Sequence, residues 1–286
     1  MVPGLAWFSL CVWDSSRLLS GEIALDAGLI GVSAALKTRY GKQERIREMR
    51  RKCVMGWLVS AIVLAGAMPA AAADATAGAD FASAYVWRGI TFNDGMVAQP
   101  YVDVAAGGFA INVWGNYDIA DYNGTLEENE FSEIDLTLSY ALPVETVDIT
   151  IGHIEYLFPN GGQGTSEVFV NACKSPLKNF SMGIDVYYDY GEVDDYYLAA
   201  TLAYILALDS SLEIGVSASA GYAGDDFSPG PDSGLHEYTL AVNASCPLGR
   251  NLALSAVFAF TDSLDEDVLP DQEVDFYGGF GFSWYF

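Results

Sequence analysis

Apolar and polar residues alternate with a period of two along most of the chain after residue 80. The residues between the apolar positions are mostly small or polar, so each such run predicts a β-strand with one apolar face. The clearest apolar series is at the C-terminal end: Val274, Phe276, Gly278, Phe280, Phe282, Trp284 and Phe286. Similar runs predict about twelve strands, near residues 80–91, 98–106, 109–119, 130–140, 146–157, 166–173, 179–190, 195–205, 211–222, 235–246, 251–261 and 274–286.

The predicted connections alternate between short turns and longer segments that are rich in acidic residues, glycine or proline. Residues 107–108 and 248–250 are short connections, whereas 120–129, 223–233 and 262–273 are long ones. Outer-membrane barrels have short periplasmic turns, longer outer loops and tilted strands of this length. A soluble β-sandwich would fill its interior with bulky side chains, but the inward positions here are mostly small or acidic. We therefore predict an all-β fold, a transmembrane antiparallel β-barrel of about twelve strands.

Residues 49–73 have the pattern of a secretory signal peptide. A short basic segment precedes the apolar run at 54–67, and small residues follow it up to Ala73. The small residues at 71–73 place the expected cleavage after Ala73. The apolar run is shorter than the roughly 20 residues of a spanning helix, which argues against a permanent membrane anchor. Residues 1–48 precede a complete signal and are interpreted as a spurious N-terminal extension. Residues 74–286 are then the exported barrel, and the outer membrane is its expected location.

The predicted mature part is strongly acidic. Without residues 1–73, the chain keeps 213 of its 286 residues, with four basic side chains against 33 of the 38 acids. The resulting net charge of −29 repels nucleic acid and attracts cations, so a nucleic-acid partner is excluded. Cys173 and Cys246 are interpreted as unpaired strand-end residues, although an oxidising periplasm leaves a disulfide open. No spacing of side chains indicates a metal site or a cofactor.

Two segments resemble the TorF-type putative porins, a family of bacterial outer-membrane proteins. The first is residues 83–91, SAYVWRGIT, and the second runs from Glu133 to Pro159 and continues at 166–170. The resemblance implies a porin-like barrel. The alternating aromatic C-terminus is similar to the signal recognised by outer-membrane insertion machinery, which implies barrel-assembly machinery, periplasmic chaperones and outer-membrane lipid as partners. The residues expected to carry this signal are Phe282, Trp284 and Phe286.

The alternation also predicts which side chains line the lumen. An inward ring of acids favours cations. The leading hypothesis is a passive, weakly cation-selective diffusion channel for small cationic or neutral solutes. Arg88, the one inward base found, is expected to pair with acids across the lumen. The candidate pore-lining residues are Arg88, Asp103, Asp118, Asp135, Asp148, Asp185, Asp189, Glu213, Glu237 and Asp275.

The sequence leaves two alternatives to a channel. A non-conducting scaffold of the murein-synthesis type would share the signal and the barrel, but the short periplasmic turns offer little surface for a partner. An outer-membrane hydrolase would need a histidine near a nucleophile on the outer face. His153 has no serine on its own strand, and His236 starts a strand beside loop residues. Both histidines are interpreted as interfacial polar residues, and the protein as a non-enzyme.

Overall fold

A computed structural model describes residues 73–160, 162–208 and 212–286, and everything below refers to them. The predicted extension at 1–48 and nearly all of the predicted signal peptide lie outside these residues. The strands are β1 (Asp74–Ala82), β2 (Tyr85–Trp87), β3 (Ile90–Asn93), β4 (Val97–Ala106), β5 (Phe109–Asp118), β6 (Glu130–Leu142), β7 (Asp148–Leu157), β8 (Ser166–Leu177), β9 (Phe180–Asp189), β10 (Asp195–Ala207), β11 (Glu213–Ala223), β12 (Gly234–Pro247), β13 (Leu252–Ser263) and β14 (Phe276–Tyr285).

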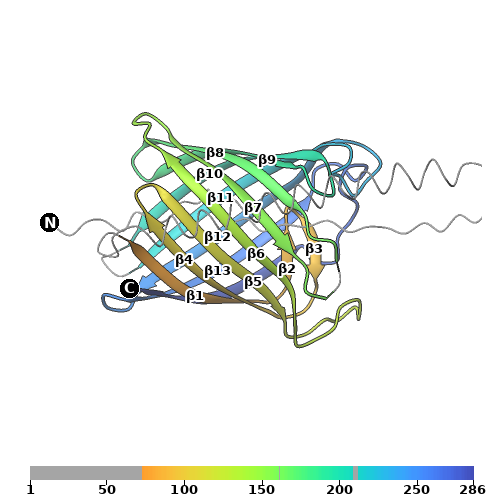
Figure 1. Ribbon diagram of the computed structural model, residues 1–286, viewed down its shortest axis with the longest axis horizontal. Helices are drawn as coiled ribbons and strands as arrows, with labels where there is room; N and C mark the ends of the chain where they lie inside the picture. Colours follow the sequence, from red (N-terminus) through yellow and green to blue (C-terminus); the bar gives the residue numbers. More distant parts are fainter. Residues whose placement is uncertain (1–72, 161, 209–211) are drawn as a thin grey trace, which may run out of the picture. The chain divides into compact units, whose positions relative to one another are not determined.

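Twelve of the described strands close into one antiparallel barrel. Each pairs with its neighbours in sequence order, except that β1 pairs directly with β4 on one side and with β14 on the other. The closing seam aligns Ala79 with Phe282, and the amide of Phe286 donates to the carbonyl of Ala75 over 3.0 Å. Both ends of the barrel segment therefore lie at the same rim, and the strands are inclined to the barrel axis (Figure 1). The predicted twelve-stranded barrel is confirmed.

On β9 and β14 the two faces of the strand differ as the alternation predicts. On β9, Met182 and Ile184 are exposed on the outside, while Asp185 between Ile184 and the next outward residue is buried. On β14, the outward Phe280, Phe282 and neighbouring aromatics are exposed, whereas Gly281 faces inward against Asp80. A surface of exposed apolar side chains is unfavourable in water and suits a hydrocarbon environment.

The first predicted strand is wrong in its bounds. Residues 80–91 contain the end of β1 and the whole of β2, and β1 itself begins at Asp74. Residues 83–96 form the connection to β4, and within it β2 and β3 form a separate two-stranded hairpin. The hairpin residues also alternate, so periodicity alone does not separate them from a barrel strand.

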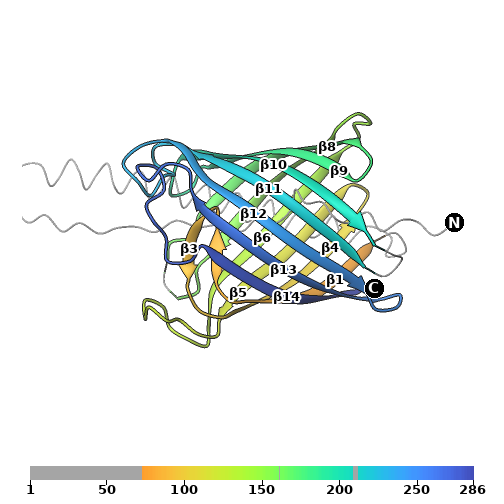
Figure 2. The same cartoon turned by 180° about the vertical axis from the view of Figure 1, so that it is seen from behind.

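The long connections lie together at one end of the barrel, opposite the two chain ends of the barrel segment. Both views place the β2–β3 hairpin within the outline of the barrel at this loop end (Figures 1 and 2). The hairpin packs there in a buried cluster with wall and loop residues, so the interior of this end is filled by protein. The cluster is Tyr85, Trp87, Ile90, Val97, Ile154, Tyr156, Phe169, Tyr187, Tyr197, Ala223, Phe227, Val268 and Leu269.

Candidate functional site: a caged arginine inside the barrel

Arg88 sits at the tip of the hairpin because of the turn that joins β2 to β3. Trp87 pairs with Ile90, which leaves Arg88 and Gly89 as a two-residue turn. Both have positive φ, 48° and 80°, as tight hairpin turns require. A Cβ on Gly89 would lie 2.6 Å from the Cβ of Glu237 on β12. Glycine therefore provides both the turn geometry and the close approach of the hairpin to the barrel wall.

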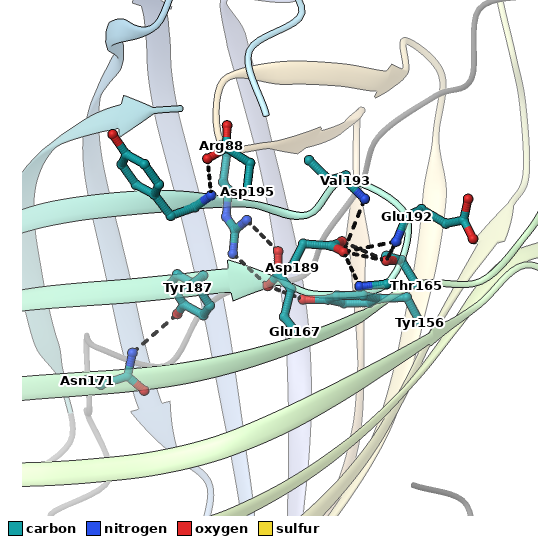
Figure 3. A network of polar contacts seen from close by, with 12 residues as sticks. Arg88, Tyr156, Thr165, Glu167, Asn171, Tyr187, Asp189, Glu192, Val193 and Asp195 are labelled. Atoms are coloured by element: carbon teal, nitrogen blue, oxygen red, sulfur yellow. Dashed lines mark hydrogen bonds and ion pairs between the residues drawn. The ribbon is translucent and has the colours of Figure 1, made fainter. Parts of the chain in front are cut away.

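The guanidinium of Arg88 forms a bidentate ion pair with Glu167 on β8. The distances are 2.9 Å from Nη1 to Oε1 and 3.0 Å from Nη2 to Oε2, and the two side chains are 4% and 2% exposed. This planar fork is the strongest geometry for an arginine–carboxylate pair. The predicted cross-lumen pairing of Arg88 with an acid is confirmed, and Figure 3 shows the two side chains meeting inside the barrel.

Four aromatic rings surround the same guanidinium. Its Cζ lies 4.2 Å from the ring centre of Trp87, 4.3 Å from Tyr187 and 4.4 Å from Tyr197. The ring of Phe227, from the β11–β12 connection, is 5.0 Å away. Each distance is within the range of cation–π attraction. We call Glu167, Trp87, Tyr187, Tyr197 and Phe227 the Arg88 cage.

Hydroxyl groups hold the carboxylates around the cage in place. Tyr156 donates to Oε2 of Glu167 over 2.8 Å, so this oxygen serves both the tyrosine and the arginine. Tyr197 donates to Oε1 of Glu237, whose other oxygen lies 2.7 Å from Nδ1 of His236. Such fully bonded buried carboxylates are fixed in orientation.

Asp189 forms hydrogen bonds to two loops beside the cage. Its carboxylate accepts a hydrogen bond of 2.7 Å from the hydroxyl of Thr165. It also accepts from the backbone amides of Gly191, Glu192 and Val193 at 2.8, 3.1 and 3.3 Å. One side chain thereby connects the β7–β8 and β9–β10 loops (Figure 3).

The predicted lumen acids fall into two groups. Those toward the loop end are buried among protein partners: Asn93 donates to Asp118 over 2.7 Å, and Asn171 donates to Asp185 over 2.8 Å. Asp135 and Glu237 are buried as well. The buried group comprises Asp118, Asp135, Asp185, Asp189 and Glu237.

The second group keeps contact with solvent. Asp103 lies between the outward Val102 and Val104, so it faces inward, and it accepts a hydrogen bond from Asn112. Asp148 and Glu213 begin β7 and β11 on the inward face, near the rim with the short turns. Asp275 is exposed just before β14 at the loop end. The accessible acids thus lie mainly in the half of the barrel away from the hairpin.

None of the five cage residues was among the lumen residues predicted from the sequence. Glu167 lies on β8, where the outward exposure of Val168 and Val170 places it inward. Phe227 belongs to a connection, where no periodicity indicates its direction. The signal for Glu167 was present in the alternation of residues 166–171, whereas Phe227 had none.

The two histidines, both interpreted as interfacial, differ in their surroundings, and the interpretation is wrong for His236. His153 is on the outer face, where its Nε2 lies 2.6 Å from the hydroxyl of Tyr190. His236 is instead fully buried beside Glu237, because a register irregularity between Ala220 and Tyr222 on β11 displaces the facing strand.

The described part of the chain gives no indication of a catalytic cysteine or serine. Ser166 lies on the strand next to His153, but its hydroxyl donates to Glu155 over 2.7 Å. Cys173 and Cys246 are free thiols, as interpreted from the sequence. Among the residues described, no group of three potential ligands is arranged to hold a metal ion. No described helix is long and apolar enough to cross a membrane.

No family model matches the chain, and no curated protein matches it. Solved structures do. The KdgM porin, in a complex with disordered oligogalacturonate, has a TM-score of 0.50 at 9% identity, and the alignment covers 74% of this chain and 99% of that one. The NanC porin has a TM-score of 0.46 at 11% identity, covering 75% and 100%. The translocator domain of the autotransporter NalP from Neisseria meningitidis has 0.42 at 10%, covering 82% and 96%.

At these identities the likeness concerns the fold alone. The described residues form a closed, twelve-stranded antiparallel β-barrel, a fold similar to that of the KdgM porin.

Proposed function

We propose that this protein is a porin-like channel of the bacterial outer membrane, which passes small cationic and neutral solutes by passive diffusion with weak cation selectivity. The closed barrel supports the membrane location, since its outer face is apolar and its sheet has no open edge. The signal peptide expected at 49–73 and the resemblance to TorF-type porins agree with it. The aromatic residues Phe282, Trp284 and Phe286 are exposed on the outer face, where assembly machinery can reach them.

The observation that carries the selectivity is the charge balance inside the barrel. Arg88 is neutralised by Glu167, so it offers no free positive charge to the lumen. Asp103, Asp148 and Glu213 face the solvent-accessible half without a basic partner among the contacts described for them. Acids that line a water-filled passage raise the local concentration of cations.

The hairpin makes the loop end the narrow part of the proposed route. It fills the lumen with Tyr85, Trp87 and Ile90, which pack against wall and loop residues. This packing also favours the second candidate function, a non-conducting barrel that serves as a scaffold. The two candidates differ in one property: the scaffold passes no current.

Selectivity is tested by removing the accessible acids. The triple variant Asp103→Asn, Asp148→Asn and Glu213→Gln removes three lumen charges and keeps the side-chain size. In planar bilayers under a salt gradient, its reversal potential is expected to fall toward zero relative to the wild type. Glu127→Gln, which removes an exposed acid of the β5–β6 loop, is the control and should keep most of the potential. An unchanged potential in the triple variant refutes the role assigned to these acids.

A further inference from the structure

Most of the Arg88 cage belongs to elements other than the hairpin. Glu167, Tyr187 and Tyr197 belong to barrel strands, and Phe227 belongs to a loop. Only Trp87 lies on the hairpin, next to Arg88. Withdrawal of the Arg88 side chain, with the hairpin in place, therefore leaves a buried carboxylate and the four aromatic rings that surrounded the guanidinium.

Such a site is selective for one kind of cation. A buried carboxylate without a counter-charge is strongly unfavourable, so Glu167 requires a positive group. Aromatic faces attract weakly hydrated cations better than strongly hydrated ones, because less hydration is lost on entry. The two Glu167 oxygens, at 2.9 and 3.0 Å from two different nitrogens, match the planar fork of a guanidinium. A sodium ion or a primary ammonium group is more strongly hydrated and has no planar fork, so it fits the aromatic rings and the two Glu167 oxygens less well.

The second oxygen of Glu167 is already oriented for this role. Tyr156, itself fully buried, donates to Oε2 over 2.8 Å, which holds the carboxylate plane facing Arg88. The hairpin has other attachments that keep it in place when Arg88 moves: Tyr85 donates to Glu133 over 3.0 Å, and Asn93 donates to Asp118 over 2.7 Å. Exchange of the cage occupant thus requires a side-chain movement and not the release of the whole hairpin.

We propose that the cage is a binding site for guanidinium-bearing solutes, and that Arg88 is a tethered occupant that competes with them. A solute that carries this group displaces the Arg88 side chain from Glu167 and occupies the aromatic cage at the loop end of the lumen. The proposal names the solute class of the proposed channel and rests on that function for its biological meaning. Binding itself does not depend on conduction.

The test measures binding to the full chain, purified from membranes in detergent, with methylguanidinium as the probe. Binding is followed by tryptophan fluorescence, because Trp87 packs against Phe227 with ring centres 5.7 Å apart. Arg88→Ala empties the cage and is expected to bind methylguanidinium saturably, with an affinity at least about tenfold higher than that of the wild type, in which Arg88 competes. Sodium chloride at equal ionic strength should give no saturable change.

The matched control is the double variant Arg88→Ala/Glu167→Gln, which keeps the space and removes the charge. It is expected to lose the binding of methylguanidinium. Equal binding by the two variants, or no gain in Arg88→Ala over the wild type, overturns the proposal. If Arg88→Ala does not form a heat-modifiable barrel, methylguanidinium present during folding should restore the folded fraction, and failure to restore it also overturns the proposal. A protein that binds the probe but passes no current refutes the channel and leaves the cage standing.

Discussion

Arg88 and Glu167 are 79 residues apart in the chain and form a two-point ion pair inside the barrel, at 2.9 and 3.0 Å. The pair joins the hairpin to β8 and is almost entirely shielded from solvent. Because each charge is buried, the pair matters less for its own attraction than for the cost of leaving either partner alone.

Arg88→Ala is therefore expected to destabilise the folded barrel by about 3–5 kcal/mol, because it leaves the Glu167 carboxylate buried without a counter-charge. Urea unfolding in detergent, followed by tryptophan fluorescence, measures the change. The double variant Arg88→Ala/Glu167→Gln should recover part of the lost stability. A double variant less stable than Arg88→Ala would show that the ion pair is not the source of the effect.

Gly89→Ala is expected to disturb the hairpin more than Gly124→Ala. Both glycines have positive φ, 80° and 73°, so both substitutions carry a similar backbone strain of about 1–2 kcal/mol. An added Cβ at Gly89 would lie 2.6 Å from Glu237, whereas nothing lies within 4 Å at Gly124. The free energies of unfolding of the two variants measure the steric part, and equal losses would contradict the close packing of the hairpin against β12.

Asp189→Ala should loosen two loops without opening the barrel. It removes the acceptor of the Thr165 hydroxyl and of three backbone amides, which costs about 1–3 kcal/mol locally. Hydrogen exchange of the amides at 190–194 is expected to accelerate. Asp194→Asn, which removes an exposed charge from the same loop at a position of positive φ, is the matched control and should leave the exchange of Gly191 and Glu192 near the wild-type rate.

The barrel could be predicted from the sequence because lipid and lumen impose opposite demands on alternate residues. Phe280 and Gly281 show this directly, because Phe280 is exposed on the outside, whereas a Cβ added at Gly281 would clash with Asp80 on the inside. The hairpin could not be predicted from the sequence, since Tyr85, Trp87 and the residues after them alternate just as a barrel strand does. Its direction depends on the Arg88–Gly89 turn and on tertiary contacts far along the chain.

The sequence predicted the charge pairing at the site but not the residues that form the site. The pairing of Arg88 with an acid followed from the scarcity of bases in the lumen. Its partner Glu167 is indicated only by the alternation of residues 166–171, and the ring of Phe227 comes from a loop that folds inward and has no local sequence signal. The burial of His236 likewise follows from an irregularity in the pairing of β11 with β12.

Deletion of the hairpin should widen the proposed channel. Ala82 and Val97 are paired neighbours on β1 and β4, so an Asn-Gly turn can replace residues 83–96 without altering the barrel register. The single-channel conductance is expected to rise above the wild-type value, because the residues that fill the loop end are removed. Heat-modifiability on gels checks that the shortened barrel still folds. A folded variant with unchanged conductance would place the narrow part of the route elsewhere.

The channel itself is tested most directly by planar-bilayer recordings of the wild-type full chain under a salt gradient. Discrete conductance steps are expected, with a reversal potential whose sign indicates cation selectivity. The reason is that Asp103, Asp148 and Glu213 are accessible and face the lumen. The charge of Arg88 is neutralised by Glu167. A correctly folded, heat-modifiable barrel that inserts and passes no current would contradict the account and favour the non-conducting scaffold.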